Sequence, residues 1–404
     1  MITNNNDKYI RVGTTYFKVV YEPDIYNDKQ CFRRLAKWDK TSIIDDHGKD
    51  FVKNIKRYDD FINFPSHVNF KREVRGFYNE YNQLSGPVKK GDFPYTQKLL
   101  QQIFGEHLEL GLDYLSILWY HPTQLLQVLC LVSNERNTGK TTFLNWLRML
   151  FENNVGVIKK RDFQNRFNDS WVNKLIIAVD EAKFDKKEDT DYIKELATSK
   201  TQLREKKSID KRQENFYGKI LLASNNIHDF IVVDDEEIRF WVLEIKKLNE
   251  YIEDFDEKIK EEIPHFKYYL NHRKIKYPKS SRMWFKPRDI KTEALARVVK
   301  NSYDIDEKDL IEILLEYFDV AQEETIKLTL KDITHLLKTD RSHIRKGDIT
   351  NILNLKWNLY PSESTTYKFY YKVFNEFNNE HKTQVLNKKG RVYTFHKTFI
   401  EGLL

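Results

Sequence analysis

Residues 134–141 read Asn-Glu-Arg-Asn-Thr-Gly-Lys-Thr, and this stretch decides the fold. An apolar run typical of a buried strand precedes it, and a helical pattern over 142–150 follows. A strand, a glycine loop and a helix in this order resemble the phosphate-binding pattern G-x-x-x-x-G-K-[ST]. Asn134 stands at the first glycine, where we expect a left-handed turn that asparagine tolerates. The alternative is a chance Gly-Lys-Thr in a surface turn.

The loop predicts an ATP site with Mg²⁺. We expect Lys140 to place its charge on the β and γ phosphates and the Thr141 hydroxyl to coordinate the metal. Backbone N–H groups of the loop and the helix start would surround the phosphates. The residues expected to bind the nucleotide are Asn134, Asn137, Thr138, Gly139, Lys140, Thr141 and Thr142.

A second apolar run, 175–179, ends in Asp180 and Glu181. We expect Asp180 to hold Mg²⁺ through water and Glu181 to act as general base toward the attacking water. A solvated acidic turn after a buried strand is the alternative for this pair taken alone. Asp180 lies 40 residues beyond Lys140, a reasonable distance for the second core strand after the loop.

Two further residues complete the candidate catalytic set. Asn225 follows a strand-like run at 220–223, and we expect it to sense the γ-phosphate. Arg239 precedes another such run, where it suits a finger that reaches a neighbour's γ-phosphate. The alternatives are a strand-to-turn asparagine and a salt bridge from Arg239 to Glu236 or Glu237.

The chain organisation follows from the pattern of apolar runs. Strands alternating with helices over 124–248 predict an α/β fold with a mostly parallel sheet. Apolar residues at helical spacing predict a helix over 96–120 that ends at His121-Pro122. We expect an N-terminal accessory domain of mixed and helical structure (1–95), an ATPase domain (96–250), a helical linker (251–300) and a C-terminal winged-helix-like domain (301–404).

The winged-helix prediction rests on three helices and a terminal hairpin. The helices are expected over 308–318, 329–337 and 346–355, the second capped by Thr329, and the hairpin over 385–395 with a basic turn. Lys388, Lys389 and Arg391 would then lie on the wing near phosphates. The alternative is a structural cap that contacts a replication partner.

Composition limits the classes of function. The 404 residues are 40% hydrophobic and carry a formal charge of +7, which permits a polyanionic partner without requiring one. Two cysteines, Cys31 and Cys130, are too few for a disulfide framework, so a reducing compartment fits. No apolar run approaches the roughly 20 residues of a membrane helix, and residues 1–7 lack a signal-peptide core. We therefore expect a soluble cytoplasmic protein.

The ordered set Gly139-Lys140-Thr141-Thr142, Asp180-Glu181, Ser224-Asn225 and Arg239 resembles the superfamily 3 helicases, an AAA+ branch. Within it the chain is similar to the helicase part of phage and plasmid primase-helicases, the group akin to the poxvirus enzyme. A stretch from Phe163 to Trp171 also matches, and Asn134 departs from the pattern. The resemblance implies a P-loop ATPase core, a homo-hexamer with ATP between subunits, single-stranded or forked DNA as partner, and the cytoplasm of a bacterial host.

In that family a hairpin between the acidic and asparagine strands lines the central pore. Here residues 200–219 hold seven basic and three acidic residues, a net +4 that suits a surface tracking phosphates. A solvated charged loop is the alternative. The residues expected to contact the strand are Lys206, Lys207, Lys211 and Arg212.

Three functions are compatible with these residues. The first is an ATP-dependent replicative DNA helicase of a phage, plasmid or other mobile element. The second is an ATPase that remodels a replication complex without unwinding, and the third is a non-hydrolysing DNA-binding initiator. No pair of polymerase carboxylates precedes residue 100 and no zinc knuckle is found, so we expect any primase or initiator to be a separate chain or a missing segment.

Overall fold

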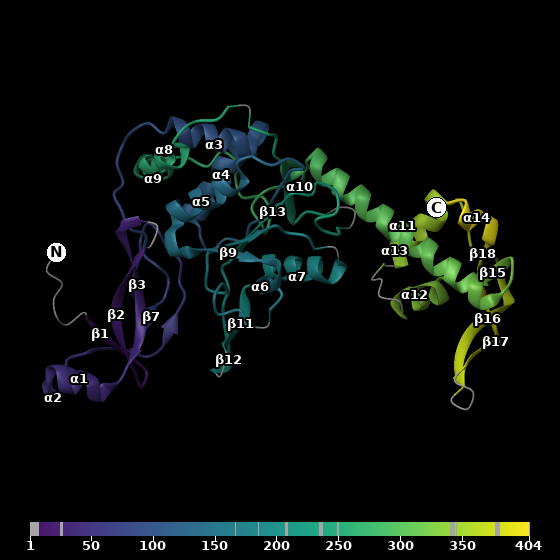
Figure 1. The fold of residues 1–404 in the computed structure, drawn as a ribbon, viewed down its shortest axis with the longest axis horizontal. Helices are drawn as coiled ribbons and strands as arrows, with labels where there is room; N and C mark the ends of the chain where they lie inside the picture. Colours follow the sequence, from purple (N-terminus) through teal and green to yellow (C-terminus); the bar gives the residue numbers. More distant parts are fainter. Residues whose placement is uncertain are drawn as a thin grey trace. The chain divides into compact units, whose positions relative to one another are not determined.

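The chain forms two compact units, traced in Figure 1. The first comprises Met1–Lys183, Asp191–Phe230 and Ile238–Leu295, and the second comprises Phe184–Thr190, Ile231–Glu237 and Ala296–Leu404. The computed structural model describes residues 8–24, 27–165, 167–184, 186–206, 209–233, 237–248, 250–339, 344, 346–375 and 380–403.

The first unit begins with a small sheet in the strand order β3-β2-β1-β4. Tyr9 is fully buried against helices α1 and α2, while Phe17, Tyr58 and Tyr78 form a second apolar cluster. The elements of this region are β1 (Tyr9–Val12), β2 (Thr15–Asp24), β3 (Asn27–Trp38), α1 (Lys40–His47), α2 (Lys49–Lys53), β4 (Lys56–Tyr58), β5 (Phe61–Ile62), β6 (Glu73–Val74) and β7 (Phe77–Asn79).

The predicted helix over 96–120 is two helices. α3 (Pro94–Phe104) ends at Gly105, whose φ of 51° leaves the helical region, and α4 (Leu108–Tyr120) begins after the 3₁₀ turn η2 (Gly105–His107). The expected helix end at His121-Pro122 is confirmed, since α4 stops at Tyr120. Apolar residues keep helical spacing on both sides of residues 105–107, so the sequence pattern did not reveal that the helix is interrupted there.

A five-stranded parallel sheet forms the centre of the first unit, with the order β14-β8-β13-β10-β9. This confirms the predicted α/β fold with a mostly parallel sheet. Four of the strands were predicted, but β9 was not, because it is an edge strand with only its first residue buried. The strands are β8 (Val128–Val132), β9 (Val155–Lys159), β10 (Ile176–Asp180), β13 (Lys219–Ser224) and β14 (Phe240–Glu244).

Helices α3, α4, α5, α8 and α9 lie together in Figure 1 and share one apolar core with this sheet. Phe143 and Trp146 of α5 are fully buried there, each contributing about 2 kcal/mol, and this anchors the helix that starts at the candidate loop. The remaining elements are α5 (Lys140–Phe151), η3 (Glu152–Asn154), α6 (Lys160–Phe163), α7 (Lys187–Thr198), β11 (Thr201–Lys206), β12 (Ile209–Asn215), α8 (Phe255–Glu261), α9 (Ile263–Leu270) and α10 (Pro287–Ile290).

The second unit packs helices against two antiparallel strand pairs, β15-β18 and β16-β17. The helix expected over 308–318 is confirmed but forms only part of a longer helix, α11. The predicted cap is confirmed: Thr329 Oγ1 accepts from the Asp332 N–H, and Asp332 Oδ2 accepts from the Thr329 N–H. The elements are α11 (Glu293–Ala321), β15 (Thr325–Leu328), α12 (Leu330–Thr339), α13 (Lys346–Asn351), the π-helical turn η4 (Ile352–Lys356), β16 (Ser364–Asn375), β17 (Glu380–Arg391), β18 (Tyr393–His396) and α14 (Lys397–Glu401).

The predicted basic turn of the terminal hairpin is wrong. Lys388 and Lys389 lie inside β17, where they pair with Tyr367 and Thr366 of β16. The two twelve-residue strands connect through residues 376–379, which lie outside the described part of the chain. The winged-helix assignment itself stays a prediction.

Among the described residues, no helix is both long and apolar enough to cross a membrane.

Candidate nucleotide site and basic hairpins

The loop after β8 leads directly into α5, as the sequence predicted. Gly139 is the helix N-cap at φ 88°, and Asn137 has φ 57°, so both occupy left-handed backbone. Asn134 has no positive φ, so the expectation that it replaces a left-handed glycine is wrong. The asparagine that this turn requires is Asn137, three residues later.

Lys140 is only 8% exposed although it carries an ammonium group. Its Nζ donates to Thr138 Oγ1 at 3.2 Å. Burial lowers the pKa of Lys140, and the Asp180 carboxylate opposes that shift. The chain thus holds a partly desolvated cation at a helix N-terminus and within electrostatic reach of Asp180, an arrangement suited to a polyanion. Thr141 is exposed in the first turn of α5.

Asp180 ends β10, and Glu181 leaves the strand with φ 55°. The Glu181 N–H donates to Asp180 Oδ1 at 3.0 Å, which fixes the carboxylate, while the Glu181 side chain is exposed. A non-glycine residue in this region stores about 1 kcal/mol of strain, which the flanking strand must offset. Such strain is common where a side chain has a functional orientation.

Strand β13 lies between β8, which precedes the loop to Lys140, and β10, which ends in Asp180. At its end the Ser133 N–H donates to the Ser224 carbonyl at 3.2 Å, and the exposed Asn225 follows. Because all five strands are parallel, their carboxyl ends share one edge of the sheet. Lys140, Asp180 and Asn225 therefore occupy the same edge.

Arg239 occupies the opposite edge. It immediately precedes β14, and its carbonyl accepts from the N–H of Val128, the first residue of β8, at 2.8 Å. A five-residue strand is about 16 Å long, so the Arg239 backbone lies about that far from the loop that follows β8. Asp235 and Glu236 lie outside the described residues, so the alternative pairing with Glu236 is untested.

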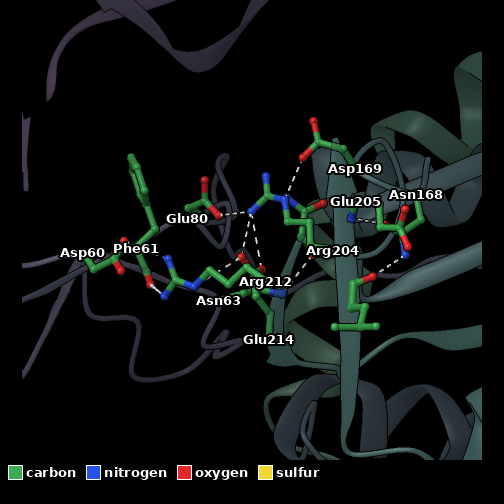
Figure 2. Close-up of polar contacts among 12 residues, drawn as sticks. Asp60, Phe61, Asn63, Glu80, Asn168, Asp169, Arg204, Glu205, Arg212 and Glu214 are labelled. Atoms are coloured by element: carbon green, nitrogen blue, oxygen red, sulfur yellow. Dashed lines mark hydrogen bonds and ion pairs between the residues drawn. The ribbon is translucent and has the colours of Figure 1, made fainter. Parts of the chain in front are cut away.

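The predicted hairpin exists, formed by β11 and β12, but its described cations Arg204, Lys211 and Arg212 are all paired within the chain. Arg204 donates to Asp169 at 2.6 Å and to Glu80 at 2.7 Å, and it lies 3.4 Å from Glu214 (Figure 2). Burial alone would lower the pKa of Arg204, but these carboxylates hold it above its ordinary value. Arg204 therefore has a structural role: it links Glu80, Asp169 and Glu214, and we call this group the Arg204 clamp.

Other cations of the hairpin are held in the same way. Arg212 pairs with Asp60 at 2.8 Å and reaches the Phe61 carbonyl, as Figure 2 shows, and Lys211 pairs with Glu205 at 2.6 Å. For Lys211 and Arg212 the expected open basic surface is wrong, because both side chains face acceptors within the chain. The Lys206 side chain and all of Lys207 lie outside the described residues, so the prediction for them is untested.

Lys219, at the end of the predicted basic stretch, is buried. Its Nζ donates to the Tyr217 carbonyl at 2.6 Å and to the Pro122 carbonyl. Burial lowers its pKa to about 7. It belongs to the core of the sheet and contributes no surface charge.

The terminal hairpin divides the remaining candidates. Lys388 pairs with Asp332 at 2.7 Å and lies over the Phe369 ring, so it is part of the packing. Lys389 and Arg391 are exposed, and their contact with phosphates stays a prediction. Sequence reasoning missed Lys368 and Lys372 of β16, because it did not predict that strand. It also missed the clamp at Arg204, whose partner Glu80 is 124 residues away and leaves no local signal.

Comparisons with known proteins agree with this architecture. Residues 131–239, from β8 to the start of β14, match a family of unknown function (DUF5906). An apo structure of the NrS-1 C-terminal region (305–718) covers 88% of this chain and 93% of its own, with TM-score 0.57 and 15% identity. An A-form apo structure of that region covers 76% and 74%, with TM-score 0.55 and 18% identity. At such identities the likeness establishes a shared fold.

Two other results carry no functional argument. A JCV helicase structure covers 54% of this chain and 62% of its own with 13% identity, but its TM-score of 0.31 is too low. No functionally curated protein matches the chain by sequence.

Proposed function

We propose that this chain is an ATP-dependent replicative helicase that moves along single-stranded nucleic acid. One observation carries the proposal: the partly desolvated Lys140 at the start of α5 lies on the same sheet edge as Asp180 and within its electrostatic reach. A buried lysine is costly unless an anion compensates it. The phosphates of ATP supply that anion.

The donors at this edge fit ATP with Mg²⁺. The Thr141 hydroxyl and the Asp180 carboxylate are oxygen ligands, which Mg²⁺ prefers. Oxygens of the ATP phosphates and water would complete the coordination, since Mg²⁺ commonly keeps several waters beside one or two protein ligands. Bound Mg²⁺ would neutralise the charge that develops on the phosphates. Residues 134–142 would orient the nucleotide through side chains and backbone N–H groups.

The exposed Glu181 is our candidate to orient the attacking water and accept its proton, since the strained backbone turns it out of β10. Asn225, at the end of the neighbouring strand, would contact the γ-phosphate. Both assignments follow from the shared sheet edge.

Arg239 supports a ring. Because its backbone lies on the sheet edge opposite Lys140, it is poorly placed to reach its own nucleotide. An arginine finger would then have to act on the nucleotide of an adjacent copy. We therefore propose a homo-hexamer in which Arg239 completes the neighbour's site. The ring's pore would hold the strand near Lys206 and Lys207, with Lys211 exchanging its present partner for a phosphate.

A second candidate is an ATPase that remodels a replication complex without unwinding. The observation that favours it is the pairing of Arg204, Lys211 and Arg212 within the chain. Its ATP hydrolysis would not respond to single-stranded DNA. A non-hydrolysing initiator would bind DNA and show no hydrolysis at all.

The test is ATP hydrolysis with and without single-stranded DNA, for the wild type and Lys140→Ala. We expect DNA to accelerate the wild type and the variant to lose hydrolysis, by at least about 100-fold, because the phosphates lose their fixed cation. Hydrolysis that persists in Lys140→Ala would show that the nucleotide site lies elsewhere.

Mixing experiments test the ring. Arg239→Ala subunits should be inactive alone yet contribute intact nucleotide sites to mixtures with Lys140→Ala subunits, so activity should depend on the ratio in a non-additive way. Strictly additive activity would exclude a finger that acts between subunits.

A further inference from the structure

A cleft of about 460 Å³ lies at the base of the β11–β12 hairpin, in the first unit. Its walls come from Phe61, Ile62 and Asn63 around β5, Phe77 of β7, and Arg212 and Gln213 of β12. The volume falls within the roughly 300–1,000 Å³ range of small-ligand pockets. The cleft adjoins the hairpin that we propose to face the strand.

Asn63 gives the cleft a hydrogen-bonding group without a partner. Its side chain belongs to a residue that is only 7% exposed, and Nδ2 donates to the Asn173 carbonyl at 3.1 Å. Its Oδ1 is buried and accepts no hydrogen bond from any described residue. A buried acceptor left unpaired is unfavourable, so a ligand that offers an N–H donor would be stabilised here.

The charges around the cleft indicate a neutral ligand. Arg212 is neutralised by Asp60 at 2.8 Å, and Glu214 lies 3.4 Å from Arg204. A phosphate would have to displace one of these carboxylates. The half-buried phenyl rings of Phe61 and Phe77 instead offer apolar surface. A flat, neutral group with an N–H donor matches all three properties.

We propose that this cleft binds one unpaired nucleobase of the translocating single strand. The inference rests on the proposed function, since it names how the strand is held beside the hairpin. Every base has an apolar face and at least one N–H donor, so the site would tolerate any sequence. Stacking against Phe77 and a hydrogen bond to Asn63 Oδ1 would hold the base, while its phosphates stay outside.

The test separates base recognition from backbone binding. The full chain is titrated with dT12 and with a twelve-unit abasic deoxyribose-phosphate strand of equal charge. We expect wild type to bind dT12 about tenfold more tightly, a ratio typical of one stacked base. Phe77→Leu keeps an apolar side chain but removes the aromatic face, so the ratio should fall toward one. Phe64→Leu, an exposed phenylalanine of the same segment outside the cleft, should keep the wild-type ratio.

Thermal unfolding of each variant shows whether it is folded, and photocrosslinking of wild type to 5-iodouracil-substituted dT12 locates the base. Crosslinks in the peptides containing Phe61 or Phe77 support the proposal. Equal affinity of wild type for both strands, an unchanged ratio in Phe77→Leu, or crosslinks only elsewhere would overturn it while leaving the helicase proposal intact. If neither strand bound, the proposed function would fail with it.

Discussion

Two hairpins of this protein, β11–β12 and β16–β17, are both rich in basic residues, but their charges differ in what they contact. In β11–β12, Arg204, Lys211 and Arg212 all face carboxylates of the chain. In β16–β17, Lys388 alone among the described cations forms an ion pair. The exposed cations of that hairpin are Lys368, Lys372, Lys382, Lys389 and Arg391. A positive count in a sequence therefore says little about nucleic-acid contact until the acceptors are located.

The largest effect should come from Arg204. Replacement by Ala leaves Glu80, Asp169 and Glu214, all at least 70% covered, without their shared cation. We expect a loss of about 3 kcal/mol in the free energy of unfolding, measured by urea titration at pH 7. Lys211→Ala is the matched control on the same hairpin, with an expected loss of about 0.5 kcal/mol because the Lys211 side chain is half-exposed. Equal losses would refute the clamp.

Lys219 should give the next largest effect, as a pH dependence. Its folded pKa is about 7 and its unfolded pKa is near the ordinary 10.5, so between these values the unfolded chain binds one more proton. Stability therefore rises with pH in this window, by about 2 kcal/mol between pH 7 and 9. Lys219→Met should lack this rise in urea titrations. The exposed Lys200→Met should keep it, and a parallel profile for Lys219→Met would contradict the buried ammonium.

Two adjacent lysines of β17, one paired and one exposed, allow a second comparison within a single strand. Lys388→Met removes the cation that faces the buried Asp332 and should cost about 1.5 kcal/mol in thermal or urea unfolding. The exposed Lys389→Met should change stability by less than about 0.5 kcal/mol. A reversal of this order would mean that the pairing with Asp332 is not formed in solution.

The lowered pKa of Asp332 predicts how acid affects the stability that the Lys388–Asp332 pair contributes. Burial alone would raise its pKa, but hydrogen bonds from Lys388, Thr329 and Tyr367 outweigh burial and lower it. The stabilisation is therefore present above the ordinary carboxyl pKa and lost as pH falls through the lower folded value. Lys388→Met should be less steeply destabilised by acid below about pH 4 than wild type.

The smallest effect concerns nucleic-acid affinity. Lys389→Met should reduce the slope of log affinity against log salt by about one, as loss of one phosphate contact does. Lys388→Met should leave that slope unchanged if it stays folded. Fluorescence anisotropy with a labelled duplex at several salt concentrations measures both. Unchanged slopes in both variants would remove this hairpin from the nucleic-acid surface.

The candidate nucleotide site at the carboxyl ends of the strands was predictable because its sequence motifs are local. A strand, Gly139-Lys140 and a helix follow one another in sequence, and parallel strands bring Asp180 and Asn225 to the same edge. Even there the residue that takes the left-handed turn is Asn137, since the sequence pattern fixes the loop's chemistry but not its backbone.

The hairpin charges were not predictable, because their partners are distant. Arg212 meets Asp60 across 152 positions, and no local pattern pairs them. The prediction of a basic turn was wrong for another reason. Asn387-Lys388-Lys389-Gly390 has turn composition, but Tyr367 and Phe369 on the opposite strand are buried in the core and fix a register that extends past it.

Unwinding of a forked duplex distinguishes a helicase from an ATPase that only remodels other proteins. Wild type with ATP and Mg²⁺ should separate the strands, and it should fail with a non-hydrolysable ATP analogue or with Lys140→Ala. Hydrolysis of ATP that Lys140→Ala abolishes, without strand separation by wild type at any fork geometry, would contradict the helicase account and leave the remodelling ATPase in its place.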